Sequence, residues 1–192
     1  MPEMDRMTEN DFSGMSREDQ MNCVRGASAS ELNVIMREYD WEQYPEAVLG
    51  WISAQKGIAL SSAMGAFFNG DPWRFNYLPK RDVGAEFRCT TSLLDSICQR
   101  INAGFYLPET DQPCEKSMQK LNLWVENQKR DLRAHRRGRW VIEVEVLEPM
   151  LQCQRAAIET ELRREPAYRI KENEPVGHRG FSLKKLAGPL AG

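Results

Sequence analysis

The fold is decided by residues 39–75, YDWEQYPEAVLGWISAQKGIALSSAMGAFFNGDPWRF, which hold three of the five tryptophans. Pro45 suits the first position of a helix, because its fixed φ fits there and its missing N–H is not needed. Gly57 is expected to end this helix, and a second helix is predicted over about 59–68, before an N-G-D-P turn. Helical spacing predicts an apolar core face on the first helix, made of Val48, Leu49, Trp51 and Ile52. Together the two segments predict a helical hairpin.

The same stretch carries a family resemblance. Tyr39-Asp40-Trp41-Glu42, the small-residue run from Leu60, the pair Phe67-Phe68 and the turn Gly70-Asp71 resemble the bacterial domain-of-unknown-function 4274 family over roughly residues 30–75. Glu42 and Ala59 stand where that family usually has aspartate. Because the family has no established activity, the resemblance implies a helical fold in a bacterial protein and no particular chemistry.

Composition predicts a soluble protein with one domain. The chain has 192 residues, 41% of them hydrophobic and 28% charged, with a net charge of -2 and a mean hydropathy of -0.59. A net charge this small attracts neither nucleic acid nor an anionic membrane, and no apolar run is long enough to span a bilayer. The five cysteines are widely spaced without a C-x-x-C pair, so we expect reduced thiols and a cytoplasmic location.

The chain divides into three predicted regions: a mobile N-terminal arm at residues 1–15, a single helical domain at 16–165, and a flexible basic C-terminal tail at 166–192. Within the domain, Ser16 and Ser28 each begin a capping-box pattern that predicts the start of a helix. Residues 73–90 predict an irregular aromatic loop, with a short hairpin as the alternative. The fold class expected is mainly α, a compact multi-helix bundle with flexible termini.

Two further helices are predicted over about 92–104 and 113–134, the second with an apolar face of Met118, Leu121, Val125 and Leu132. The segment after Arg139 is ambiguous. V-I-E-V-E-V alternates with period two, which favours a strand, whereas the longer apolar spacing to residue 164 favours a helix. We interpret it as a helix interrupted near Pro149.

The first candidate site is a possible acidic and aromatic pocket at the two turns that flank the hairpin. If the hairpin closes, two carboxylates brought together can do acid–base work, because repulsion raises the pKa of one of them. The alternative, which we favour, is that Asp40 caps a helix, Asp71 holds a turn and the tryptophans fill the core. The pocket residues are Asp40, Trp41, Glu42, Asp71 and Trp73.

The second candidate is a basic cluster that could bind a polyanion such as a nucleic-acid backbone. Its members are Lys129, Arg130, Arg133, Arg136, Arg137 and Arg139. The alternative is structural: cations at a helix C-terminus stabilise its dipole and can pair with Glu126, Glu143 or Glu145.

Metal and cofactor sites are not expected. His135 and His178 are far apart in the sequence, no two cysteines have ligand spacing, and no glycine-rich phosphate-binding loop occurs. We therefore interpret the chain as a cytoplasmic, non-enzymatic helical module that binds another macromolecule, with protein (a partner or a second copy) favoured. The alternatives are nucleic-acid or polyanion binding through residues 129–139, and a hydrolase or lyase that uses carboxylates near Asp40 and Asp71.

Overall fold

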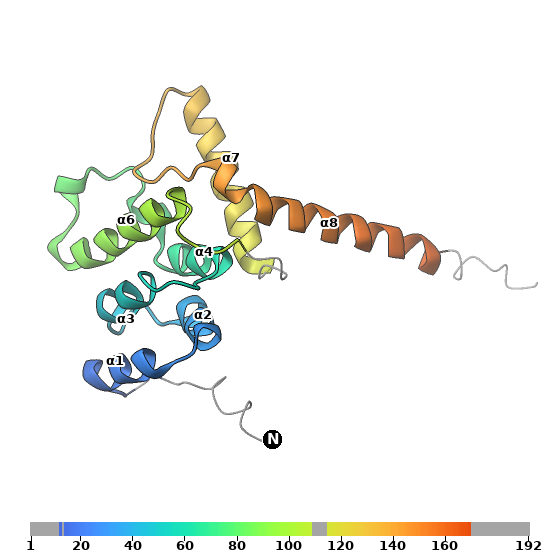
Figure 1. Cartoon of the computed structure of the whole chain (residues 1–192). Helices are drawn as coiled ribbons and strands as arrows, with labels where there is room; N and C mark the ends of the chain where they lie inside the picture. The colour runs from blue at the N-terminus through green and yellow to red at the C-terminus, as the bar shows by residue number, and fades with distance from the viewer. Residues whose placement is uncertain (1–11, 13, 109–114, 170–192) are drawn as a thin grey trace, which may run out of the picture. The chain divides into compact units, whose positions relative to one another are not determined.

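Helix α4, Leu60–Asn69, lies at the centre of the structure, and every residue from Leu60 to Phe68 is buried. Its many small residues allow other helices to approach closely. Helices α2 (Ala29–Glu38), α6 (Arg88–Asn102) and α7 (Glu115–Arg133) pack against it (Figure 1). The computed structural model describes residue 12 and residues 14–108 and 115–169, and within them it contains no β-strand. The mainly α-helical prediction is confirmed.

The first two helices begin where their capping residues predict. Helix α1, Arg17–Gly26, is capped by Ser16, whose hydroxyl accepts from the backbone N–H of Asp19. Helix α2 has a complete capping box between Ser28 and Glu31. Of the expected N-terminal arm, residues 1–11 and 13 lie outside the described residues. Phe12 is buried, with its ring 5.7 Å from that of Tyr39, so packing begins before Ser16.

The predicted hairpin is wrong. Helix α3, Pro45–Ile52, begins at Pro45 as expected but ends five residues before Gly57, and it packs chiefly on α1 and α6, whereas α4 packs chiefly on α2, α6 and α7. The connection explains the difference. Leu107 pairs with it through two backbone hydrogen bonds, one to Ile58 O at 2.9 Å and one from Leu60 N at 2.8 Å. This tie fixes the connection before α4 to the segment that follows α6.

The region after α4 is irregular, as predicted, although it contains short helical turns. These are α5 (Pro72–Phe75) and the 3₁₀ turns η1 (Lys80–Asp82) and η2 (Ala85–Phe87). The rings of Phe75 and Phe87 pack 5.4 Å apart, and the guanidinium of Arg74 lies 4.1 Å from the Phe87 centroid. Aromatic contacts therefore hold the segment against the start of α6.

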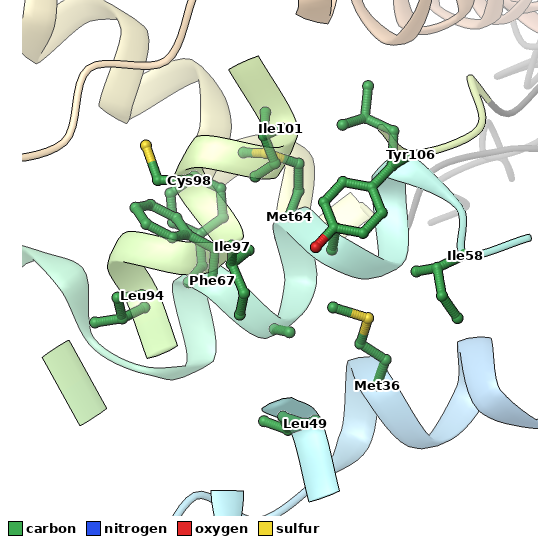
Figure 2. Close-up of a cluster of buried hydrophobic side chains, with 14 of the residues drawn as sticks. Met36, Leu49, Ile58, Met64, Phe67, Leu94, Ile97, Cys98, Ile101 and Tyr106 are labelled. Carbon is green, nitrogen blue, oxygen red and sulfur yellow. The ribbon is translucent and has the colours of Figure 1, made fainter. Parts of the chain in front are cut away.

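The core draws side chains from α2, α3, α4 and α6. Figure 2 shows Met36, Leu49, Phe67 and Ile97 converging from these four helices, all of them essentially inaccessible to solvent. Trp51 is only partly buried, so its expected place in the core is wrong. The most buried tryptophan is Trp124 of α7, which is not part of the apolar face predicted for that helix.

The C-terminal helices correct two more expectations. Leu132 was assigned to the buried face of α7 but is 77% exposed. Helix α8, Val144–Arg169, begins five residues after Arg139 and continues through Pro149. Leu147 and Met150, on either side of the proline, are buried and hold these turns on the core.

Contacts divide the chain into one unit up to Arg155 and a second from Ala156 onwards. The described part of the second unit, residues 156–169, is helical. Four residues of the expected C-terminal tail thus belong to α8, and the rest of that tail, residues 170–192, lies outside the described residues. None of the helices in the described ranges combines the length and apolar character that crossing a membrane requires.

Candidate functional site

The turns around Asp40 and Asp71 lie close together, because the ring of Trp41 covers Gly70. A Cβ at Gly70 would fall 2.6 Å from Trp41 Cη2, so this approach requires glycine. Asp40 accepts a hydrogen bond from the backbone N–H of Glu42 at 2.9 Å, which closes a side-chain turn, and Asp71 has a left-handed backbone with φ 51°. Both aspartates are exposed. The geometry gives each a role in a turn, and acid–base chemistry by the pair stays a prediction.

Trp73 faces a different part of the molecule. Its ring stacks on Phe68 with centroids 5.2 Å apart and meets Trp124 edge to face at 5.1 Å. Phe67 and Trp140 extend this aromatic cluster, with ring centroids 5.9 Å apart. The predicted pocket is therefore divided: Asp40, Trp41, Glu42 and Asp71 lie at the two turns, with Trp41 partly buried against the core, and Trp73, also partly buried, joins the aromatic cluster.

The six predicted basic residues do not form one surface, because Arg139 points inward. Its side chain is 11% exposed, and its Nε and Nη2 donate to the two carboxylate oxygens of Asp95 at 2.9 and 2.8 Å. Trp140 Nε1 also donates to Asp95, and Lys80 forms an ion pair with it. Burial raises the pKa of Asp95, but these partners outweigh burial and hold that pKa below its usual value. Arg139 therefore ties the loop after α7 to helix α6.

Arg136 is also paired within the protein. Its Nε and Nη2 donate to Asp131 Oδ1 at 2.9 and 2.6 Å, and its guanidinium lies 4.3 Å from the ring centroid of Tyr77. The Tyr77 hydroxyl donates to the other oxygen of Asp131 at 2.6 Å. This hydrogen bond and the neighbouring Arg136 together outweigh the effect of burial and lower the pKa of Asp131, and the same hydrogen bond raises the pKa of Tyr77.

The remaining cations are exposed. Lys129 Nζ lies 2.8 Å from Glu126 Oε1, a surface pair along α7. Across the described residues, no ion pair or hydrogen bond engages the side chains of Arg130, Arg133 or Arg137. Three of the six residues are thus available to an anion, and polyanion binding through residues 129–139 stays a prediction.

The loop after α7 leads into a segment without regular secondary structure, residues 139–143, that is held by side-chain amides. We call Asn76, Asn102 and Gln128 the amide clamp. Gln128 accepts from Ile142 N at 2.8 Å and donates to Ile142 O at 3.0 Å. Asn102 donates to Val141 O at 2.7 Å and accepts from Glu143 N at 2.9 Å. Asn76 accepts from the N–H groups of residues 139 and 140, through its backbone and its side chain respectively.

The amide clamp is itself fixed by its surroundings. Trp124 Nε1 donates to Gln128 Oε1 at 2.7 Å, which links the clamp to the aromatic cluster. Gly138 packs directly on the side-chain amide of Asn76, so that a Cβ there would overlap it. The first half of the alternating V-I-E-V-E-V pattern is thus irregular backbone held by side-chain amides, the second half belongs to α8, and the helix predicted from Arg139 begins only at Val144.

The amide clamp shapes one wall of a groove of about 410 Å³, which we call the α7–α8 groove. Its other walls are the C-terminal half of α7 and the first turn of α8. Leu132 and Val144 line it and are 77% and 38% exposed. The apolar lining comprises Val125, Leu132, Trp140, Val141, Ile142 and Val144. Lys129, Arg136 and Arg137 contribute cations from α7 and the following loop, and Glu143 and Glu145 contribute carboxylates next to α8.

Sequence analysis missed this groove, although two signals were present. Leu132 has helical spacing with the buried face of α7, but α7 ends one residue later and nothing covers that last position. The other signal was the alternation of apolar and acidic residues from Val141. Such an alternation is found in strands, and it is found equally in a groove wall that carries both apolar and acidic side chains. Among the described residues, no group of three or more His, Cys, Asp or Glu side chains is placed to hold a metal ion.

The resemblance of residues 30–75 to the domain-of-unknown-function 4274 family stays a prediction and gives no information about the groove. Comparison of the chain with protein-family models, with curated proteins and with solved structures finds no match.

Proposed function

We propose that this protein is a binding module that holds an apolar segment of a partner protein in the α7–α8 groove. The observation that supports this most directly is the exposure of Leu132 and Val144 within one groove. Exposed apolar side chains that gather in a concave surface are typical of interaction sites, whereas scattered ones are ordinary. The volume of about 410 Å³ lies within the range of binding pockets and accommodates one or two large apolar side chains.

The amide clamp restricts how the partner is recognised. In residues 139–143, the N–H groups of Arg139, Trp140, Ile142 and Glu143 and the carbonyls of Val141 and Ile142 are already hydrogen-bonded. A partner that added itself as a strand would need these groups. The occupant is therefore recognised through its side chains, as when an amphipathic helix lays its apolar face in a groove.

The groove rim adds a requirement for charge. Lys129 and Arg137 lie on the side of α7 and its loop, and Glu143 and Glu145 lie beside α8. A partner helix with an apolar face flanked by an acidic edge and a basic edge complements this arrangement. The three described cysteines that are unpaired, Cys23, Cys89 and Cys98, agree with a reducing, cytoplasmic location for the interaction.

The first prediction tests the groove by replacing Leu132. Peptides selected from a random displayed library against the full chain are expected to bind wild-type protein, and Leu132→Asp is expected to weaken them at least about tenfold, because a carboxylate would be buried in the apolar contact. Fluorescence anisotropy with the labelled peptides measures this. Because Leu132 is exposed, the free energy of unfolding should change by no more than about 0.5 kcal/mol.

Leu123→Asp is the matched control. Leu123 is also an exposed leucine of α7, 55% accessible, but it does not line the groove. Equal loss of peptide binding in both variants, or none in either, would remove the groove from the proposal. If binding is lost instead on triple charge reversal at Arg130, Arg133 and Arg137, the polyanion alternative is favoured.

A further inference from the structure

A second hollow, of about 350 Å³, lies between α3 and α6, and its chemistry differs from that of the α7–α8 groove. Helix α6 contributes residues at successive four-residue steps, which places them in one row along the helix surface. These are Arg88, Ser92, Ser96 and Arg100. Helix α3 contributes Glu46 and Gly50 on the facing wall. We call this hollow the α3–α6 trough.

Arg100 is held in place at one end of the trough. Its Nη1 donates to the hydroxyl of Ser53 at 2.8 Å, and Ser53 is fully buried and donates in turn to Gly50 O at 3.1 Å. A guanidinium has five N–H donors, so others remain for a ligand. The side chain is thus oriented before any ligand arrives, which reduces the entropy that binding must overcome.

Charge in the trough is unbalanced. Across the described residues, neither Arg88 nor Arg100 forms an ion pair with a carboxylate, and Glu46 is the acidic residue of the lining. The two guanidiniums therefore exceed the acid by one charge. Guanidinium groups match carboxylates in fork geometry, and the hydroxyls of Ser92 and Ser96 add neutral hydrogen-bonding groups between them.

The shape of the trough favours an extended ligand over a compact one. At about 1.5 Å per residue, Arg88 and Arg100 are about 18 Å apart along α6. An extended peptide covers that distance in about five or six residues, at about 3.3 Å each. Small-molecule sites are enclosed and mostly apolar, whereas this surface is open and Leu93 is its one large apolar lining residue.

We propose that the α3–α6 trough binds an extended acidic peptide segment of a partner protein, with carboxylates near its two ends paired to Arg88 and Arg100. This site does not depend on the α7–α8 groove, and it assigns a second partner surface to the protein. The neutral residues between the two acids lie along Ser92 and Ser96. Gly50 keeps the facing wall open, because it has no side chain and no atom lies within 4 Å of where a Cβ would stand.

The test uses a fluorescein-labelled octapeptide of Gly and Ser with glutamates at its second and seventh positions, and the same peptide with glutamines there. Anisotropy at low salt with the full chain should show binding of the acidic peptide and none of the neutral one. Arg88→Glu is expected to raise the Kd about tenfold or more, because it places like charges together. Arg88 is exposed at the first position of α6, where an acid suits the helix dipole, so the variant should fold.

Gly50 supplies a steric test with a matched pair. Gly50→Leu fills the trough from the α3 side and is expected to weaken the peptide, whereas Gly50→Ala should leave its Kd unchanged. Arg130→Glu, an equal charge reversal on α7, should retain most of the peptide binding, and Leu132→Asp should retain all of it. The trough proposal and the groove proposal are therefore tested independently of each other.

Three outcomes would overturn the proposal: no binding of the acidic peptide, equal weakening by Arg88→Glu and Arg130→Glu, or full competition by inorganic phosphate at the concentration of the peptide. The last would show a simple anion site. Circular dichroism of each variant separates loss of binding from loss of fold.

Discussion

At the scale of single residues, the amide clamp is the feature on which the α7–α8 groove depends. Gln128 alone bonds both backbone groups of Ile142 and the indole N–H of Trp124. Ile142 and Trp124 are each about 1% exposed, so water does not replace a lost partner there. A single amide thus holds the wall of the groove and one edge of the aromatic cluster.

We therefore predict that Gln128→Ala lowers the free energy of unfolding by about 2–4 kcal/mol, because it leaves two or more buried polar groups unpaired. Chemical denaturation measures the loss. Gln119→Ala is the control, since Gln119 is an exposed glutamine of the same helix. Similar small losses in the two variants would show that the clamp contributes little to stability.

At the scale of elements, α4 and α7 are joined by aromatic rings. Trp124 meets Phe67 edge to face at 5.5 Å and Trp73 at 5.1 Å, and it is about 1% exposed. Trp51 of α3 lies outside this cluster and is partly buried. The tryptophans of this chain therefore differ in what they contribute, although their residue type is the same.

This difference gives a prediction for the two helices. Trp124→Ala is expected to cost about 3–5 kcal/mol, the usual loss for a buried aromatic side chain, and Trp51→Ala clearly less. Denaturant titrations of both variants provide the comparison. A larger loss for Trp51→Ala would mean that α3, and not the α4–α7 contact, supports the core.

Local signals in the sequence predicted where the first helices begin. Contacts between residues that are distant in the sequence could not be predicted from it. Ser28 and Glu31 fix the start of α2 through contacts three residues apart, which a sequence displays directly. The hairpin prediction was wrong, and the pairing of Leu107 with the connection before α4 is a contact between residues distant in the sequence that no local pattern displays. The prediction that Leu132 is buried was wrong because helical spacing specifies a face of the helix but not which element covers that face.

The candidate sites show the same limit. The sequence predicted that the turns of Asp40 and Asp71 meet only if the hairpin closes, whereas in the structure Trp41 reaches Gly70 without that hairpin. The sequence could not show that Arg139 is separate from the rest of the basic cluster, because its ion-pair partner, Asp95, is 44 residues away. Local patterns line the groove and the trough, but they do not say which element lies opposite, since each hollow is assembled from segments that meet only in the folded protein.

At the scale of the whole molecule, the chain divides into two units, and the boundary in the sequence falls between Arg155 and Ala156. Leu147 and Met150, which are buried among the α8 residues whose side chains are described, both belong to the first unit. The groove and the trough also lie entirely within it. The first unit thus contains every proposed binding surface.

We predict that a chain that stops after Arg155 unfolds at the same denaturant concentration as the full chain, because it keeps the core intact. Truncation after Glu143 is the contrast, and it should cost about 2–5 kcal/mol for each of the two buried side chains removed. Equal behaviour of the two truncations would show that residues 144–155 are not part of the cooperative unit.

The amide clamp has one more consequence, which concerns solubility. A stretch of alternating valine and glutamate has the character of a β-strand, and extended backbone with open N–H and C=O groups can recruit strands from other molecules into aggregates. In residues 139–143, Asn76, Asn102 and Gln128 already occupy most of these groups. The protein can therefore present Val141 at the groove without offering a template for intermolecular sheet growth.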